Sequence, residues 1–556
     1  MSETEAPSKA PNARVVKPGY DKRGDPTWQT RMSAPDNSFA LCLMVPDRIV
    51  PIIFVPGVMG SNLKGVGRGE GTQWRLDSNR SMLPWLGRNA AARKRSLTPA
   101  TMRVDDGGEI PEGTNQQTEE LKRRKWGEVG AMSYADFLVW LENALNDYDN
   151  PHVGERVKLM RESLNALVGE KPLDRQEVAL SYKYRFPVHA CGYNWLDDNK
   201  SSATRLAQRI DEVIARYRSE GKRCEKVILV THSMGGLVAR YCSEVLGYRE
   251  KIFGIVHGVM PAIGAAAVYR RFKAGTEGSY LASEVLGNDA AEMTAVLSSA
   301  PGPLQLLPTK EYGNGWLKIQ DGEKERSLPE RSDPYTEIYA VRGKWWSMCD
   351  DQLVNPLITD RDPQKRQSEV DKNWRLFADL IHKEVKEFHK AVEGRYHPNT
   401  HAFFGSHEDV KAYGTVRWTH SWRGPLEATL FKDRPLDVMN ARPLTLEELK
   451  KKNISDEPQI KTTRSVEARY TDKGWFPTAQ RHYYISEPDE NGDGTVPHRS
   501  GIAPKPHCKS FMQVNVGHEP AYKASKGGDY LRACRFTLRA IVGIAQQVTS
   551  TSLKYD

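Results

Sequence analysis

Residues 227–240 read VILVTHSMGGLVAR, and this stretch decides the fold. A short run of branched apolar residues enters it, small residues form its middle, and a helical pattern leaves it. This order predicts a strand, a tight turn and a helix, with the hydroxyl of Ser233 exposed at the end of a sheet. Such a turn needs small residues two positions on either side of the serine. Gly235 meets this need, whereas Thr231 stands where glycine is usual. The other interpretation is a plain Gly-Gly turn in which the serine has no role.

A second strand and turn lie earlier in the chain. Residues 49–55 are a short β-branched run closed by a Pro-Gly pair, which predicts a fully buried strand of a parallel sheet. The loop that follows, PGVMGS at 56–61, contains two glycines that permit unusual backbone dihedral angles. We expect the amide of Val58 in this loop, together with the amide of Met234, to form an oxyanion hole. A purely structural Gly-rich turn is the alternative.

The order of the strand and helix signals predicts the fold class. A candidate strand and loop at 185–195 precedes an amphipathic helix at 201–217, and a buried strand at 252–257 follows the strand and helix of 227–240. Strands that alternate with helices in this way form parallel sheets with helices on both faces. We therefore predict an α/β fold with a mostly parallel sheet.

The alternation stops after Pro261, which predicts a large insertion. Residues 372–393 have the apolar spacing of a long amphipathic helix, and 336–341 and 401–404 are two candidate strands. We expect a mainly helical cap or lid over the active edge of the sheet. The predicted divisions are a flexible N-terminal arm at 1–45, the first part of the core at 46–261, the cap at 262–480 and the rest of the core at 481–556.

Ser233 needs partners, because a serine hydroxyl is a poor nucleophile until a base removes its proton. On α/β-hydrolase sheets the chain order is serine, acid, histidine. Asp493 lies in a Gly-Asp-Gly turn and His518 follows a predicted strand at 510–516, so they are the predicted acid and base. The other candidates are His482, His498 and His507 for the base, and Asp350, Asp351, Glu487 and Asp489 for the acid.

The acidic turn has a second interpretation as a calcium site. Its ligands would be Asp489, Glu490, Asn491 and Asp493. The spacing lacks the full EF-hand loop and its terminal glutamate, so calcium is the weaker prediction. A serine mechanism requires no cofactor. The seven cysteines include no close pair of the kind that binds a metal.

Composition excludes several classes of protein. The chain has 556 residues, a formal net charge of +9 and 27% charged residues, which is typical of a globular protein. It contains no apolar run long enough for a transmembrane helix, and no basic motif with interleaved aromatic residues that would indicate nucleic-acid binding. The basic clusters at 93–95 and 122–125 are solvated faces in the simplest interpretation and otherwise suit an anionic membrane surface.

Four blocks of the sequence together resemble a known family. They are PGVMGSNL at 56–63, THSMGG at 231–236, GDGTV at 492–496 and the late His518. These blocks look like the lecithin:cholesterol acyltransferase and PGAP1-like branch of the α/β-hydrolases. A large chain with these motifs, a big cap and no apolar secretory signal at its start also resembles the bacterial phospholipase effectors that type VI secretion delivers.

The resemblance implies an α/β-hydrolase fold and a serine lipase or phospholipase that acts at a membrane surface through an acyl-enzyme. It also implies an antibacterial protein that is made in the bacterial cytoplasm and delivered to the periplasm of a target cell. A secretion-system component and a cognate immunity protein would then be its partners. A water-soluble esterase, thioesterase or acyltransferase is the alternative among enzymes, and a non-catalytic binding protein on a hydrolase scaffold is the alternative outside them.

Overall fold

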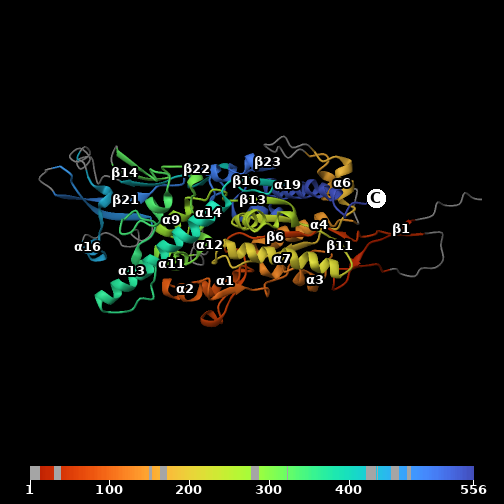
Figure 1. The fold of residues 1–556 in the computed structure, drawn as a ribbon, viewed down its shortest axis with the longest axis horizontal. Helices are drawn as coiled ribbons and strands as arrows, with labels where there is room; N and C mark the ends of the chain where they lie inside the picture. Colours follow the sequence, from red (N-terminus) through yellow and green to blue (C-terminus); the bar gives the residue numbers. More distant parts are fainter. Residues whose placement is uncertain are drawn as a thin grey trace, which may run out of the picture.

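The structure is a computed structural model. It describes residues 13–29, 39–148, 153–162, 172–276, 287–321, 324–420, 434, 436–451, 462–472 and 477–555. The molecule is elongated, with the central sheet and its helices in one part and a second sheet toward the other end of the long axis (Figure 1). Among the described residues, each helix is too short or too polar to cross a membrane.

A six-stranded parallel sheet forms the core. In spatial order its strands are β10 (Val188–Ala190), β6 (Ile52–Val55), β12 (Val227–His232), β13 (Ile252–Gly258), β16 (Thr400–Gly405) and β23 (Cys508–Val514). Neighbouring strands pair in parallel throughout. The sheet confirms the predicted parallel α/β architecture.

Helices cover both faces of this sheet. They are α7 (Asn199–Ser219) and α8 (Gly235–Arg240) on one face, and α4 (Ala131–Leu145) and α19 (Gly528–Ala545) on the other. Successive strand residues point to opposite faces. In β6, Ile53 and Val55 therefore pack with the first pair of helices, whereas Ile52 and Phe54 pack with the second. Burial on both faces explains why this strand is an unbroken apolar run in the sequence.

The strand order reverses between β6 and β12. The chain moves from β6 outward to β10, and then returns past β6 to form β12. At such a switch point the loops after the two strands diverge and leave a crevice at the carboxyl ends of the strands. Ser233 directly follows β12, and the glycine-containing loop at 56–61 directly follows β6. The fold therefore brings the first two predicted parts of the site to this crevice.

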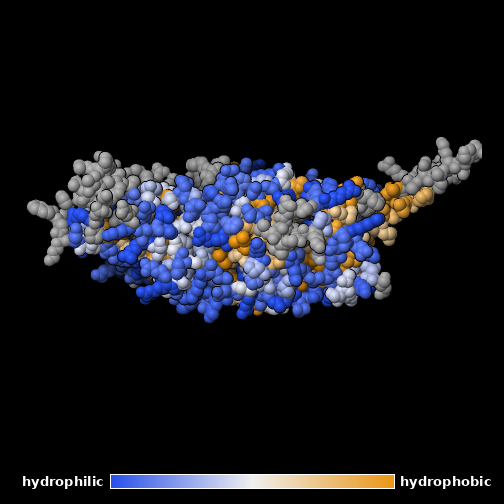
Figure 2. Space-filling view, turned by 90° about the horizontal axis from the view of Figure 1, so that it is seen from above, coloured by the Kyte–Doolittle hydropathy of each residue, from blue (hydrophilic) through white to orange (hydrophobic). Residues whose placement is uncertain are grey.

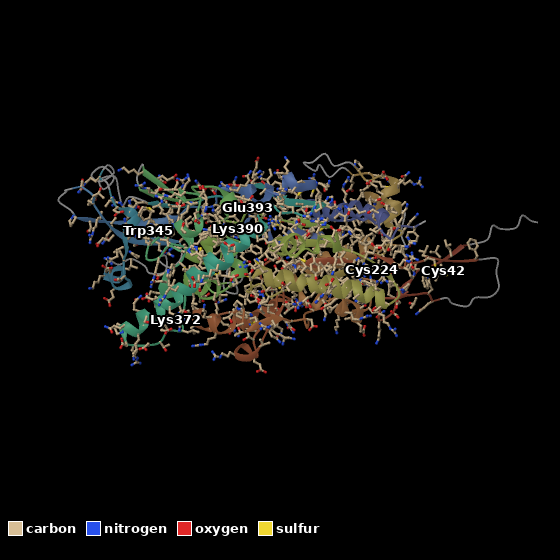
Figure 3. All side chains as sticks on the ribbon, in the orientation of Figure 1. Cys42, Cys224, Trp345, Lys372, Lys390 and Glu393 are labelled. Atoms are coloured by element: carbon tan, nitrogen blue, oxygen red, sulfur yellow. The ribbon has the colours of Figure 1, made fainter. Side chains whose placement is uncertain are left out.

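The described part of the predicted arm contains two short paired segments. β1 (Ala13–Val16) pairs with β4 (Phe39–Cys42), and β2 (Gly19–Tyr20) pairs with β3 (Pro26–Thr27). β1 and β4 project from the body with exposed apolar side chains, and Cys42 marks this end (Figures 2 and 3). Residues 1–12 and 30–38 lie outside the described residues, so the flexibility of the arm stays a prediction.

The region predicted as one insertion at 262–480 is interrupted by a core strand. β16 lies between β13 and β23 in the central sheet. Two insertions therefore exist, one between β13 and β16 and another between β16 and β23. The sequence marked 401–404 as a candidate strand but could not place it, because a parallel strand has its partners far away in the chain.

The two insertions meet in a second, six-stranded sheet, which accompanies the expected helices and was not predicted from the sequence. Its strands in spatial order are β15 (Lys324–Leu328), β14 (Leu317–Asp321), β18 (Val416–His420), β21 (Thr478–Ile485), β20 (Thr463–Arg469) and β19 (Arg442–Pro443). β14 of the first insertion pairs in parallel with β18 of the second. These strands carry several charged residues, so their apolar pattern is weak.

The predicted amphipathic helix is confirmed. α13 (Pro363–Leu380) continues through one wider turn into α14 (Lys386–Val392), and Figure 3 labels Lys372 and Lys390 along this path. The candidate strand at 336–341 is instead a helical turn, Tyr335–Tyr339.

Trp345 joins the two insertions. Its ring stacks on Tyr483 with centroids 4.5 Å apart and meets Trp418 edge-on at 5.4 Å. Its indole N–H donates a hydrogen bond to the carbonyl of Val438 at 2.7 Å. Trp345 comes from the first insertion, whereas these three partners come from the second. Figure 3 shows it in the part of the molecule that holds the second sheet.

Truncation of Trp345 should therefore destabilise the protein strongly. We expect Trp345→Ala to lower the free energy of unfolding by about 3–5 kcal/mol, because loss of the large buried ring leaves a cavity and removes the hydrogen bond to Val438. Leu376→Ala, at a side chain that is 61% exposed on α13, should change it by less than about 0.5 kcal/mol. Chemical unfolding followed by circular dichroism measures both. Equal effects of the two substitutions would contradict this role of Trp345.

Candidate active site

The turn after β12 has the geometry predicted for a nucleophile elbow. Ser233 has a φ of +52°, in the left-handed region that residues other than glycine rarely adopt. Its N–H donates a hydrogen bond to the carbonyl of Gly258 on β13 (2.9 Å). A Cβ atom at Gly235 would lie 2.5 Å from the carbonyl oxygens of Val55 and Pro56. Glycine is therefore required at 235, as the sequence pattern predicts.

Thr231 occupies the other small-residue position of the elbow without disturbing it. The side chain is fully buried, and its hydroxyl lies 2.9 Å from Nδ1 of His257 on the neighbouring strand. The carbonyl of Thr231 accepts a hydrogen bond from the hydroxyl of Tyr522. The hydroxyl and the carbonyl of Thr231 are thus both satisfied, so threonine is tolerated where glycine is usual.

The three residues predicted as nucleophile, base and acid lie in one hydrogen-bonded line. His518 Nε2 is 2.9 Å from the Ser233 hydroxyl oxygen, and His518 Nδ1 is 2.8 Å from Oδ2 of Asp493. The side chain of Asp493 is 1% exposed and that of His518 is 15% exposed. A buried carboxylate that accepts from Nδ1 fixes the tautomer that leaves Nε2 free to take a proton from the serine.

The sheet and a turn hold Asp493 in place. Gly405, the last residue of β16, is so close that a Cβ atom there would lie 2.5 Å from Cβ of Asp493. The second carboxylate oxygen accepts backbone hydrogen bonds from Thr495 (3.0 Å) and Val496 (2.7 Å). The backbone carbonyl of Asp493 accepts from the N–H of His518 at 2.8 Å. The acid therefore lies at the end of β16, although an insertion separates the two in the chain.

A second hydrogen-bonded chain links the loops that carry these groups. The N–H of Gly57 donates to the hydroxyl of Tyr134 (3.0 Å), which lies 3.0 Å from Nδ1 of His232. Nε2 of His232 lies 2.9 Å from the backbone carbonyl of His518. A carbonyl can only accept, so Nε2 of His232 carries the proton and Tyr134 donates to Nδ1. The loop after β6, the elbow and the histidine loop are thus tied together.

His232 and Tyr134 were not identified from the sequence. The one signal was the position of His232 beside the serine, and nothing in the sequence indicated the pairing with Tyr134 on α4. Burial, together with the charge of the nearby His518, lowers the pKa of His232 to about 3. His232 is therefore neutral at physiological pH, as its acceptor role toward Tyr134 requires. Burial also raises the pKa of Tyr134, so its hydroxyl keeps its proton.

The predicted oxyanion donors lie beside the serine. Val58 lines the same cavity as Ser233, and Met234 follows the serine directly. In the part of the chain that the structure describes, neither amide donates a hydrogen bond, whereas the amide of Gly57 is occupied by Tyr134. The amides of Val58 and Met234 thus have no competing acceptor, and their role as oxyanion donors stays a prediction.

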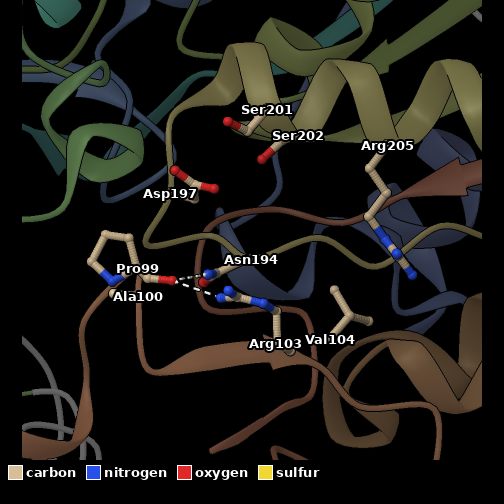
Figure 4. Close-up of a pocket in the computed structure, with 9 residues that line it drawn as sticks. All are labelled: Pro99, Ala100, Arg103, Val104, Asn194, Asp197, Ser201, Ser202 and Arg205. Atoms are coloured by element: carbon tan, nitrogen blue, oxygen red, sulfur yellow. Dashed lines mark hydrogen bonds between the residues drawn. The ribbon is translucent and has the colours of Figure 1, made fainter. Parts of the chain in front are cut away.

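Ser233 and His518 open into a cavity of about 230 Å³ with a largely apolar wall. Its apolar lining consists of Val58, Met59, Leu76, Pro261, Ala265, Ala267, Val268, Leu306 and Val496. The polar side chains include Tyr134 and Thr495, with Arg271 and Glu519 as the charged ones. A larger cleft of about 510 Å³ lies between the first turn of α7 and β9 (Met102–Val104), and Figure 4 shows its polar lining, which includes Asp197 and Arg205. None of the predicted site residues lines that cleft.

Comparison with known proteins agrees with this geometry. A family model described as a PGAP1-like alpha/beta domain matches residues 199–270, which run from α7 through the elbow to the residues after β13. Residues 199–270 are thus similar to a PGAP1-like alpha/beta domain. The elbow with Ser233 lies inside this matched segment. No curated protein is significantly similar to the chain.

Among solved structures, a chain of the Tle4–Tli4 complex is similar to this protein. The TM-score is 0.68 and the sequence identity 25%, and the match covers 89% of this chain and 98% of that chain. The likeness thus extends well beyond the segment that the family model matches and into the two insertions.

The other candidate bases and acids lie elsewhere. His498 lies 3.0 Å from the hydroxyl of Ser406, His482 pairs with Ser465, and His507 stacks on Tyr396.

The acidic turn does not form one metal centre. Asp489 accepts hydrogen bonds from two backbone amides, Glu490 pairs with Arg499 and Asn491 accepts a hydrogen bond from Lys411. These side chains point to different partners rather than to one centre. Among the described residues, no group of three or more His, Cys, Asp and Glu is arranged to hold a metal.

The buried state of His232 predicts a pH dependence of stability. Below about pH 6.5 an unfolded histidine binds a proton that folded His232 does not accept until about pH 3. As the pH falls through this window, each such group therefore lowers the free energy of unfolding by about 1.4 kcal/mol per pH unit. Burial lowers the pKa values of His257, His389 and His401 as well, so the wild-type protein should lose stability steeply.

In His232→Gln the slope of unfolding free energy against pH, between about pH 6 and about pH 4, should be shallower by about 1.4 kcal/mol per pH unit. Chemical unfolding at several pH values measures it. An unchanged slope would show that His232 is protonated in the folded state.

Proposed function

We propose that the protein is a serine hydrolase of lipid esters, a lipase or phospholipase. The observation that carries this proposal is the line Ser233–His518–Asp493 at the edge of an apolar cavity, beside two unoccupied backbone amides. His518 takes the proton as Ser233 attacks the ester carbonyl, and later gives it to the leaving alcohol. Asp493 orients the imidazole and stabilises its charged form. The amides of Val58 and Met234 bind the oxyanion, and water then resolves the acyl-enzyme.

The apolar wall supports an acyl chain as the group beside the ester. Long aliphatic chains gain free energy by leaving water for such a wall, whereas small polar esters do not. Lipid substrates lie in a membrane, so the enzyme would act at its surface as a peripheral protein. A water-soluble esterase or an acyltransferase would use the same triad, and no cofactor enters the steps above.

The similarity to a chain of the Tle4–Tli4 complex supports a role as an antibacterial effector that type VI secretion delivers to a target cell. On this proposal the producing cell also makes a cognate immunity protein. A protein that co-purifies from the producing cell and blocks ester hydrolysis would identify it, and hydrolysis unaffected by every co-purifying protein would weaken the effector role.

Product analysis with a panel of phospholipids tests the proposed activity. We expect the wild-type protein to release free fatty acid and lysophospholipid, and Ser233→Ala to release neither above background, because removal of the nucleophile lowers the rate by about 10⁶-fold in a serine hydrolase. Mass spectrometry of the lipid extract measures both products. Equal fatty-acid release by Ser233→Ala, or release of the head group instead of fatty acid, would contradict the proposal.

A further inference from the structure

The cavity beside Ser233 contains a cation that the triad does not use. Arg271 lies on α9 (Ala267–Ala274), which follows the end of β13 and covers the crevice. Its Nη2 lies 3.4 Å from the hydroxyl of Thr495. Thr495 in turn donates its backbone N–H to the carboxylate of Asp493. The guanidinium is therefore held against the loop that carries the acid, on the wall of the catalytic cavity.

The neighbours of Arg271 place this charge at the end of an apolar surface. Ala267 and Val268 lie four and three residues before it on α9, so all three belong to one face of the helix, and all three line the cavity. Glu519, the other charged residue of the lining, forms an ion pair with Lys523 at 3.2 Å and accepts a hydrogen bond from Ser133. The wall that α9 contributes to the cavity thus presents an apolar strip that ends in a guanidinium.

This arrangement matches the chemistry of one lipid class. In a glycerophospholipid the acyl ester and the phosphodiester are joined through the same short glycerol unit, so a phosphate lies near any acyl ester that reaches a nucleophile. A guanidinium offers planar, paired N–H donors that fit two phosphate oxygens. We propose that Arg271 forms an anion subsite for the phosphate group of a glycerophospholipid whose acyl ester lies at Ser233. This inference rests on the proposed lipid-ester hydrolase function.

The test compares two substrates that differ in the phosphate. Phosphatidylglycerol and diacylglycerol with the same acyl chains are offered in the same detergent micelles, and kcat/KM is measured for each. In Arg271→Met the ratio of kcat/KM for phosphatidylglycerol to that for diacylglycerol should fall about 10- to 100-fold, because hydrogen bonds to a charged group are lost. Arg271→Lys should keep part of the preference, because it retains the charge but not the paired donors.

Arg270→Met is the matched control. Arg270 is the adjacent residue of α9 and is half-buried like Arg271, but it does not line the cavity. It should keep the wild-type ratio and a similar thermal midpoint. An unchanged ratio in Arg271→Met, or an equal fall for both substrates, would overturn the subsite. The wild-type protein could also hydrolyse p-nitrophenyl butyrate but not phosphatidylglycerol. This result would overturn the phosphate subsite and leave the serine mechanism intact.

Free phosphate is the other source of the same chemistry. Inorganic phosphate is therefore added to the diacylglycerol assay. Phosphate could inhibit the wild type but not Arg271→Met, while the wild type shows no preference for phosphatidylglycerol. This result would identify a site for free phosphate and overturn the assignment to a lipid.

Discussion

The left-handed backbone of Ser233 is the constraint on which the rest of the site depends. A residue other than glycine in this conformation costs about 1–3 kcal/mol, so the surrounding structure must enforce it. The hydrogen bond from Ser233 to Gly258 and the close approach of Gly235 to β6 do so. Both need β12 to lie between β6 and β13 in a buried parallel sheet. The strand order that creates the crevice and the strain that exposes the serine therefore have one origin.

The loops around the serine are coupled rather than independent. Tyr134 and His232 connect the amide of Gly57 to the backbone of His518, so the oxyanion loop and the histidine loop share one network with the elbow. A buried neutral histidine is costly in acid, and the protein retains it at the centre of this network. The two insertions of the cap are coupled in a similar way. Trp345 precedes β16 in the chain and packs against Trp418 and Tyr483, which follow β16.

Much of the site could be predicted from the sequence because its signals are local. The glycines, the apolar run at 227–230 and the Gly-Asp-Gly turn each reflect a backbone requirement within a few residues, and the structure brings Ser233, Asp493 and His518 together. The cap could not be predicted in the same way. Its sheet pairs β14 with β18, and β16 joins the core across a long insertion, so the deciding contacts are remote in the chain. The pairing of Tyr134 with His232 is remote for the same reason.

The central claim is that His518, held by Asp493, activates Ser233 as a nucleophile. Reaction with a fluorophosphonate, followed by peptide mass spectrometry, tests it most directly. The account predicts one adduct, on Ser233, which is absent from Ser233→Ala and forms far more slowly in His518→Ala. An adduct on another serine, or labelling of Ser233→Ala at the wild-type rate, would contradict it.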